Sequence, residues 1–458
     1  MTKNPMEKVR QLQRRLWVCA KSSKTRRFHA LYDRIHRSDV LWEAWKRVRS
    51  NKGAAGVDET TLRSIEEQGV TQFLEGIQAE LKAGRYRPSP VKRRWIPKAD
   101  GKQRPLGIPT VRDRVIQMAA KLVIEPIFEA DFHESSYGFR PKRSATQALE
   151  AIRMAGNRGH SFVVDADIQG YFDSIDRKTL MELKERISDR RVLKLIRQWL
   201  EAGVMEDGTV RETLAGTPQG GVISPLLANI YLNKLDRIWA ARCSPLGVLV
   251  RYADDFVVMC RTESQAREAL RRIGLVMNRL GLTLHPEKTK LVDLRRGKES
   301  FVFLGCTIRK KRSIQRNPRA HYMQRWPSPK ATKKLRDRVR ELTGKRQSGK
   351  EVKQIVAELT PVLRGWGNYF RTGNADREFN KMDYFVVKSL RRWQYRRGGQ
   401  RPTKREPFTG DQLHGMGLHK LMGTVKYPAQ ATSVRSSLSR VRENRTHGLK
   451  GVVRNGLA

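Results

Sequence analysis

Two pairs of aspartates stand in contexts that favour metal-ion chemistry. Asp165 and Asp167 alternate within an apolar run at 162–168, so a strand would put both on one face. Asp254 and Asp255 are adjacent at the tip of a strand–turn–strand pattern. Buried like charges repel, and divalent cations remove that cost; two Mg²⁺ ions held there can activate a hydroxyl and stabilise a departing pyrophosphate. Each pair alone also suits a polar turn, but together they predict a two-metal nucleotidyl-transfer site.

Cations precede these carboxylates in a pattern suited to phosphate. A two-stranded ribbon is predicted at 91–109, with Lys98 and Arg104 on either side of its turn. Arginine binds phosphate bidentately and lysine binds it as a point charge, so this pair suits a triphosphate. A solvated basic hairpin is the alternative that the residues alone leave open. The glycine-rich loop at 216–221 suits close backbone approach to a base or nucleotide, or else a plain turn.

The net charge indicates a polyanionic partner. The 458 residues include 93 Lys and Arg against 46 Asp and Glu, a formal charge of +47. Residues 1–50 carry a net +10, residues 51–300 another +10, and residues 301–458 a net +27. Such a charge opposes the compact state unless a polyanion neutralises it. Nucleic acid fits better than an anionic membrane, because no basic amphipathic helix has a clean apolar stripe.

Targeting and cysteine patterns exclude several classes of protein. No uncharged apolar stretch approaches the roughly 18 residues of a membrane span. The N-terminus lacks the apolar segment of a signal peptide, so we expect a cytoplasmic protein with no membrane partner. The four cysteines, Cys19, Cys243, Cys260 and Cys306, form no Cys-x-x-Cys pair. A zinc ribbon, a thiol redox motif and a disulfide framework are therefore not expected.

Short strands and longer helices must position the candidate residues. Apolar periodicity and turn residues delimit them. In chain order, we predict helical segments from 42 to 81, the ribbon at 91–109, a helix at 111–130, a strand from 162, helices from about 178 to 202, a helix from 224, the strand–turn–strand at 248–260, a helix at 264–280, a strand near 290–292, a hairpin at 301–309, and basic helices at 331–346, 351–371 and 376–397.

Ordered motifs along the chain resemble those of one family. They lie at 104–109, 137–141, 167–173, 217–230, 252–255, 285–289, 303–305 and 363–370. The most specific is Thr-Pro-Gln-Gly-Gly-Val-Ile-Ser-Pro-Leu-Leu-Ala-Asn-Ile at 217–230, and Tyr-Ala-Asp-Asp occupies 252–255. Together they resemble the motifs of group II intron-encoded reverse transcriptases, and 363–370 resembles the family's maturase-specific thumb, domain X. The resemblance covers about residues 40–400.

The resemblance implies an α+β fold arranged as a right hand, with fingers, a palm of antiparallel sheet and helices, and an all-helical thumb. We expect an N-terminal extension and the start of the fingers at 1–90, and the fingers and palm at 91–310. The thumb, or maturase domain X, is expected at 311–400, and a basic tail that can help to bind DNA at 401–458. Since no cysteine follows Cys306, we expect the Cys/His endonuclease domain of many relatives to be absent.

The resemblance also implies which aspartates are catalytic. By register with the family, Asp167, Asp254 and Asp255 are the catalytic residues, and with Ile168 they bind two Mg²⁺ ions. Asp165 shares the face of Asp167 but is not the matching position.

Five residues correspond to the family's contacts with the incoming dNTP. Lys98 and Arg104 match the triphosphate-binding pair, and Phe172 matches the steric gate against a ribose 2′-hydroxyl. Gln219 matches the residue that braces template and nucleotide, and Lys288 matches the proposed general acid for pyrophosphate departure.

Further residues are expected to contact nucleic acid from the fingers, the glycine-rich loop, the primer-grip turn and the thumb. They are Arg140, Gly220, Leu304, Gly305, Arg364, Arg371, Arg391 and Arg392.

The implied function is that of an RNA-directed DNA polymerase that extends a DNA primer or target with dNTPs. As a maturase it would also bind its group II intron RNA, assist splicing and support retromobility. Two alternatives stay open: an RNA-binding maturase that no longer polymerises, and a reverse transcriptase adapted to DNA repair or defence in the host. The complete set of aspartates favours a polymerase over the first, and the sequence flanking the gene would decide the second.

Overall fold

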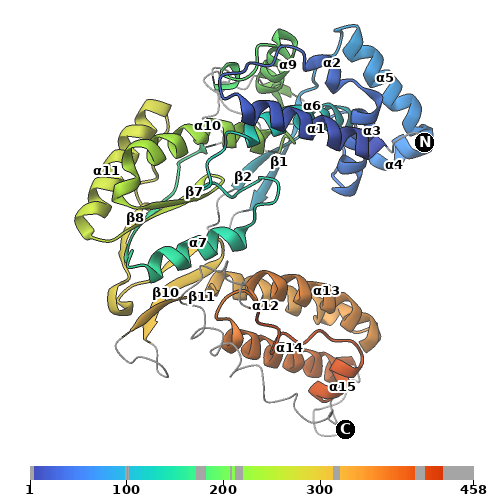
Figure 1. The fold of residues 1–458 in the computed structure, drawn as a ribbon. Helices are drawn as coiled ribbons and strands as arrows, with labels where there is room; N and C mark the ends of the chain where they lie inside the picture. Colours follow the sequence, from blue (N-terminus) through green and yellow to red (C-terminus); the bar gives the residue numbers. More distant parts are fainter. Residues whose placement is uncertain are drawn as a thin grey trace, which may run out of the picture. The chain divides into compact units, whose positions relative to one another are not determined.

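The computed structural model describes residues 5–97, 101, 103–171, 182–206, 209–211, 220–312, 320–397 and 408–426. The chain divides into two compact units, Met1–Gln324 and Arg325–Ala458, which are described in turn (Figure 1). The first combines helices with small sheets, and the second is mainly helical. Within the described ranges, every helix is too short or too polar to traverse a lipid bilayer.

The first unit begins with a helical layer built around α6. Its helices are α1 (Pro5–Ser22), α2 (Tyr32–Ile35), α3 (Ser38–Ser50), α4 (Leu62–Gln68), α5 (Val70–Lys82), α6 (Val111–Glu129) and α9 (Arg190–Glu201). The core helix predicted at 111–130 is confirmed as α6, since Val115, Leu122 and Val123 are fully buried where α1 and α3 pack on it. The hydroxyl of Thr110 accepts a hydrogen bond from the backbone N–H of Asp113 and caps the first turn.

A four-stranded sheet beside these helices contains the predicted ribbon. Its strands are β1 (Val91–Pro97), β2 (Gln103–Ile108), β4 (Val204–Glu206) and β5 (Thr209–Arg211), in the order β2-β1-β4-β5. β1 and β2 pair antiparallel with Ile96 opposite Arg104, which confirms the hairpin.

The central sheet is antiparallel and carries the aspartates. It comprises β3 (Phe162–Ala166), β6 (Val248–Tyr252), β7 (Asp255–Cys260) and β8 (Lys290–Asp293), in the order β6-β7-β3-β8. One face packs on α10 (Ser224–Ile238) and α11 (Glu263–Leu280), while α7 (Ala145–Asn157) lies against β6 and β7. Val164 and Val258 enter the core with α10 and α11, so the alternate residues Asp165 and Val257 face the other way.

A third sheet has the order β11-β10-β9 and adds one strand that the sequence did not predict. The expected hairpin is formed by β9 (Phe301–Phe303) and β10 (Cys306–Arg312), and the added strand is β11 (His321–Pro327). Short one-turn or π segments, at Trp239–Cys243, Ser244–Leu246, Arg295–Gly297 and Lys345–Gln347, connect the longer elements.

The second unit is a helical bundle. Its helices are α12 (Pro329–Leu342), α13 (Val352–Phe370), α14 (Asp376–Arg397) and α15 (Gly410–Gly415), and the first three confirm the predicted basic helices. Residues 408–426, expected as part of a tail, pack on this bundle: Leu413 and Leu421 are fully buried. The carboxylate of Asp383 in α14 accepts hydrogen bonds from the backbone N–H groups of Leu421 and Met422.

Candidate active site

The β3–β7 pairing brings two predicted aspartates to the same end of the central sheet. Ala166, the last residue of β3, lies opposite Phe256 in β7. One step further along the same register, Asp167 follows Ala166 and Asp255 precedes Phe256, so these two aspartates are neighbours across the strands. Asp254 lies in the two-residue turn that joins β6 to β7, where Tyr252 pairs with Asp255.

Two carboxylates at this end of the sheet, those of Asp165 and Asp255, have raised pKa values. Asp255 is an exposed residue. Partial burial of its carboxyl group, followed by the charges of Asp254 and Asp167, nevertheless raises its pKa to about 6. Burial, followed by the charges of Asp255 and Asp167, raises the pKa of Asp165 to about 6 as well. Asp165 therefore belongs to the charge cluster, although the family resemblance predicts the metal ligand at Asp167 and not at Asp165.

A neighbouring segment holds Asp167 in place. The backbone N–H of His285 donates to the carbonyl oxygen of Asp167 over 2.8 Å, and Ile168 forms an isolated antiparallel bridge with Leu284. Lys288, from the same segment, donates from Nζ to Oδ2 of Asp167 over 2.8 Å. The predicted general acid is thus next to the predicted metal ligand.

The donor set suits a hard divalent cation. Among the described residues, no group of three Asp, Glu, His or Cys side chains is placed to hold a metal ion. The ammonium of Lys288 pairs with the carboxylate of Asp167 at 2.8 Å. The mutual repulsion of the remaining carboxylates is the feature that a divalent ion would relieve.

A buried ion pair supports the turn that carries Asp254. Arg251 and Asp236 are both fully buried and pair through two hydrogen bonds, with Nε to Oδ1 at 2.8 Å. Arg251 Nη1 also donates to the carbonyl oxygen of Ala253 in the turn, at 2.9 Å, and to Oδ1 of Asn229, at 3.1 Å. Burial disfavours the charged guanidinium, but the carboxylate of Asp236 outweighs that cost and raises the pKa of Arg251.

A loop from the predicted finger motif packs directly on the same turn. A Cβ added to Gly138 would lie 2.3 Å from the backbone nitrogen of Ala253, so only glycine fits there. The N–H of Tyr137 donates to the carbonyl oxygen of Arg251 over 2.8 Å, and Asn229 Nδ2 donates to that of Gly138 over 2.7 Å. Sequence reasoning missed these supports, although an arginine inside an apolar strand signals a buried partner.

Arg140 corrects one expectation. It was predicted to contact nucleic acid, but its side chain is buried and its donors are used within the protein. Nε and Nη2 bind the carboxylate of Glu129, while Nη1 donates to the carbonyl oxygens of His133 and Ser136 at 2.6 and 2.8 Å. Arg140 braces the loop instead, because its side chain is buried and four of its five N–H donors bind oxygens of the protein.

Two other predicted contacts lie in tight backbone turns. Leu304 and Gly305 have φ of +48° and +74° and join β9 to β10, the geometry of a two-residue hairpin turn. Gly220 has φ +128°, and a Cβ there would lie 2.2 Å from the carbonyl oxygen of Gly107 in β2. The glycine therefore permits close approach between the glycine-rich loop and the ribbon.

Most of the predicted dNTP contacts fall outside the described side chains. Lys98, Phe172 and Gln219 lie outside the described residues, and only the backbone of Arg104 is described, opposite Ile96. These roles remain predictions.

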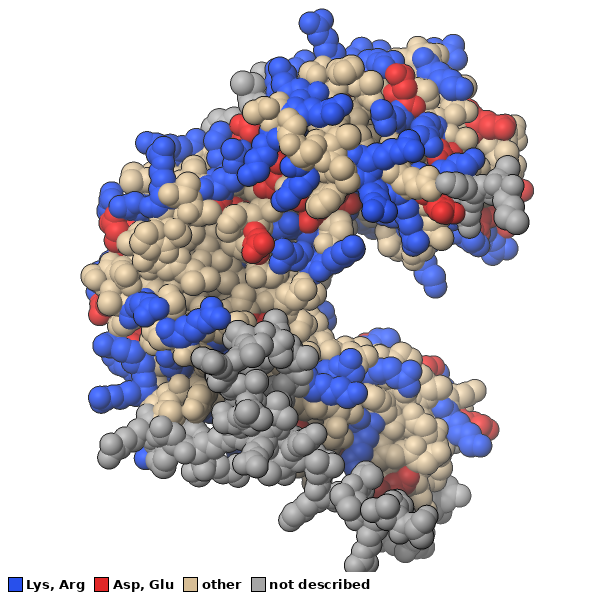
Figure 2. Space-filling view, viewed as in Figure 1, with Lys and Arg blue, Asp and Glu red and all other residues tan. Residues whose placement is uncertain are grey.

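The predicted arginines of the second unit differ in exposure. Arg364 and Arg392 are exposed, whereas Arg371 and Arg391 are half-buried. Nε of Arg391 donates to the carbonyl oxygen of Phe408 over 3.1 Å. Figure 2 shows Lys and Arg side chains across the visible face of each unit, outnumbering Asp and Glu.

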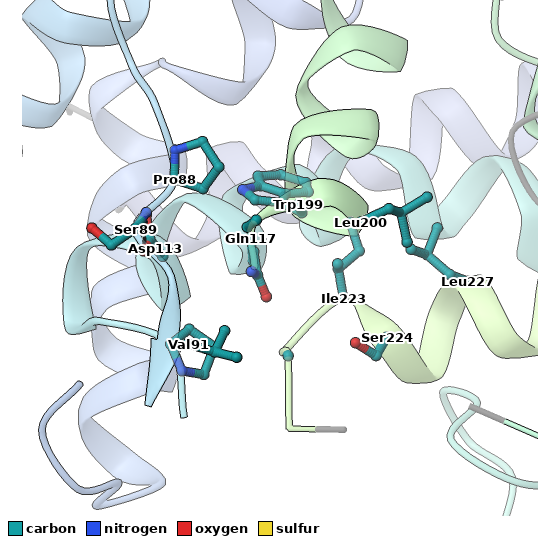
Figure 3. A pocket seen from close by; sticks show the side chains of 13 residues that line it. Pro88, Ser89, Val91, Asp113, Gln117, Trp199, Leu200, Ile223, Ser224 and Leu227 are labelled. Carbon is teal, nitrogen blue, oxygen red and sulfur yellow. Dashed lines mark hydrogen bonds between the residues drawn. The ribbon is translucent and has the colours of Figure 1, made fainter. Parts of the chain in front are cut away.

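A mostly apolar cavity lies between β1, α6, α9 and the start of α10 (Figure 3). The polar groups on its wall are engaged: Asp113 accepts from Tyr86 and Thr110, and Gln117 accepts from the backbone N–H of Val222. Its lining comprises Pro88, Ser89, Val91, Pro109, Asp113, Gln117, Trp199, Leu200, Ala202, Gly221, Ile223, Ser224 and Leu227. None of the clustered aspartates lines it, so we assign this cavity to packing.

Known proteins match both parts of the chain. Residues 96–308 match the family described as reverse transcriptase (RNA-dependent DNA polymerase), and residues 332–407 match the group II intron, maturase-specific domain. Protein YkfC of Escherichia coli is 34% identical over 344 residues, covering 67% of this chain and 89% of YkfC. Group II intron-encoded protein LtrA of Lactococcus lactis is 41% identical over 214 residues, covering 46% of this chain and 35% of LtrA. An uncharacterized 91 kDa protein in the cob intron of Schizosaccharomyces pombe is 27% identical over 423 residues, covering 76% of this chain and 51% of that protein.

The mixed helix-and-strand architecture, with an antiparallel sheet inside the matched region, is the right-hand fold of reverse transcriptases. The maturase-specific match follows it along the chain. The chain belongs to the group II intron reverse transcriptase/maturase family, which confirms the family expected from the ordered motifs.

Proposed function

We propose that this protein is an RNA-directed DNA polymerase that uses two Mg²⁺ ions. The observation that carries the proposal is the juxtaposition of Asp167 and Asp255 across β3 and β7, with Asp254 in the adjoining turn. The raised pKa of Asp255 reflects burial and then repulsion from Asp254 and Asp167, and bound cations would relieve that repulsion. Mg²⁺ prefers a few carboxylates together with substrate phosphate oxygens, which fits this set of donors.

The three aspartates and Lys288 have distinct roles in this mechanism. Asp167, Asp254 and Asp255 would hold the ions, and Ile168, whose side chain has no donor atom, would contribute its main-chain oxygen. When bound, Mg²⁺ would supply a lower pKa for the primer 3′-hydroxyl and charge neutralisation for the departing pyrophosphate. We propose that Lys288, whose Nζ lies 2.8 Å from Oδ2 of Asp167, would donate a proton to the leaving pyrophosphate.

Residues of the fingers and the glycine-rich loop would bind the dNTP. We propose that Lys98 and Arg104 bind its triphosphate and that Phe172 collides with a 2′-hydroxyl, which favours dNTPs over rNTPs. Gln219 would brace the template and the incoming nucleotide.

Primer extension on an RNA template tests this function. The full chain should incorporate dNTPs only when template, primer and Mg²⁺ are all present. Tight RNA binding without any extension would instead favour the maturase that no longer polymerises.

Metal binding should stabilise the protein more at about pH 7.5 than at about pH 5. Because its folded-state pKa is raised, Asp255 is protonated in the metal-free fold at a pH where the unfolded chain has lost that proton. In the absence of metal, the contribution of Asp255 to the free energy of unfolding therefore falls as pH rises from 3.8 to about 6. Mg²⁺ can replace the proton only toward the upper end of that range, where the carboxyl group ionises. We expect Mg²⁺ to raise the Tm at the higher pH and to have little effect at the lower one.

Thermal unfolding with and without Mg²⁺ at both pH values measures this effect. Asp255→Asn should reduce the pH-dependent part, and the remainder should come from Asp165, whose pKa burial also raises to about 6. An equal rise in Tm at both pH values in the natural protein would contradict metal binding at the cluster.

We propose group II intron RNA as template and structural partner, with the second unit contributing to its binding. Support comes from the match of residues 332–407 to the maturase-specific domain and from the exposed Arg364 and Arg392. A DNA primer or target would be the other nucleic-acid partner.

Arg364→Ala should weaken RNA binding across unrelated sequences and reduce the slope of log affinity against log salt by about one. Filter binding at several salt concentrations measures both. Arg271→Ala is a matched control, because Arg271 is an exposed arginine of α11 whose charge already pairs with Glu268 at 2.7 Å. A salt slope equal to that of the natural protein would remove Arg364 from the RNA surface.

A further inference from the structure

Phe139 combines two unfavourable features beside the candidate active site. Its φ is +54°, in the left-handed region that bulky side chains avoid, and its side chain is 51% exposed. Neither strain nor the exposure of a large apolar ring contributes to folding. Such combinations persist where the surrounding structure imposes them, and they cluster at functional sites.

The surrounding contacts do impose this conformation. On one side of Phe139, Gly138 is pressed against the backbone of Ala253 and Tyr137 is hydrogen-bonded to Arg251. On the other side, the buried guanidinium of Arg140 is fixed to Glu129. The backbone is thus held firmly on both sides of a residue whose side chain stays exposed.

The ring of Phe139 is directed toward the catalytic turn. Its centroid lies 6.4 Å from that of Tyr252, with the ring planes at 44°. Lys142, which is exposed, and Arg143, whose guanidinium lies 5.4 Å from the ring centroid of Tyr137, follow in the same loop. Aromatic rings beside cations are the combination with which proteins bind nucleic-acid bases and their phosphates.

We infer that Phe139, next to Tyr252, contacts a base of the terminal base pair of the template–primer duplex and so holds the primer end at the aspartates. This inference rests on the proposed polymerase function. It assigns a binding role to a residue that the loop presents at the cost of strain.

The test measures duplex binding and stability separately. Fluorescence anisotropy of a labelled RNA-template/DNA-primer duplex, without dNTP, should show binding on the order of tenfold weaker for Phe139→Ala and Phe139→Asn. The Tm of Phe139→Asn should equal or exceed that of the natural protein, because asparagine tolerates positive φ. Leu275→Ala is the control, since Leu275 in α11 is exposed to the same 51% and should change neither quantity.

Two further measurements distinguish a contact from a structural effect. In primer extension, the KM for the duplex should rise more than kcat falls. The loss of duplex affinity caused by Phe139→Ala should be smaller for duplexes that lack the terminal primer base or its template partner. Whichever omission makes the loss smaller identifies the strand that Phe139 contacts. The inference would be overturned if duplex binding were unchanged, or if the loss were the same with and without either terminal base. It would also be overturned if both variants bound more weakly and both had a lower Tm. If the natural protein bound the duplex but never extended it, the proposed function would fail while the anisotropy result still tested Phe139.

Discussion

Replacing Asp254 with alanine is expected to reduce primer extension on an RNA template by about 10³-fold or more. Loss of a carboxylate that holds Mg²⁺ removes several kcal/mol of transition-state stabilisation, and each ~1.4 kcal/mol corresponds to tenfold in rate. The fold should tolerate the change, because the charge of Asp254 helps to raise the pKa of Asp255 and its removal relieves that repulsion. The Tm without metal should therefore stay equal or rise.

Asp293→Ala provides the matched control in the same sheet. Asp293 in β8 lies opposite Phe162, the first residue of β3, and pairs with Arg295 at 3.0 Å. It should retain extension activity, whereas undiminished synthesis by Asp254→Ala would contradict the two-metal mechanism. Single-nucleotide incorporation, followed with Mg²⁺ and then with Mn²⁺, measures the loss directly.

The strands of the candidate site could be predicted because their signals are local. The two-residue period of 162–168 put Asp165 and Asp167 on one face, and the structure has Asp165 on the face away from α10 and α11. The apolar runs around Asp254 and Asp255 predicted a hairpin, which β6 and β7 form. The two-residue period could not predict that β3 pairs with β7, because the paired residues lie almost a hundred positions apart in the sequence. The resemblance to the family motifs predicted that the two strands belong to one site.

The supports of the site could not be predicted, because they depend on tertiary partners. Arg140 was expected to contact nucleic acid, but its side chain binds the carboxylate of Glu129 and two backbone carbonyl oxygens. The charged N-terminus gave little sign of α1, whose Val9, Leu12 and Leu16 are buried beside α6. Val9, Leu12 and Leu16 do have the i, i+3, i+7 spacing of one helix face, a signal that was missed among the charged residues between them.

The buried Arg251–Asp236 ion pair is hydrogen-bonded to the turn that carries Asp254. Both side chains are fully buried, and the same guanidinium holds the carbonyl oxygen of Ala253 at 2.9 Å. A buried ion pair adds little stability compared with apolar residues of similar volume, but breaking it leaves one uncompensated charge. Its position under the turn therefore suggests that orientation of Asp254, as much as stability, depends on it.

Asp236→Ala is expected to lower the free energy of unfolding by about 3–5 kcal/mol, because Arg251 would remain buried without its partner. Urea denaturation measures this loss. The double variant Asp236→Leu, Arg251→Met should recover most of the stability, since both charges are then gone. It still lacks the hydrogen bond to Ala253, so extension per folded molecule should stay reduced. If the double variant is fully stable and fully active, the ion pair contributes only to packing. If it is stable but extends primers slowly, the ion pair positions the turn.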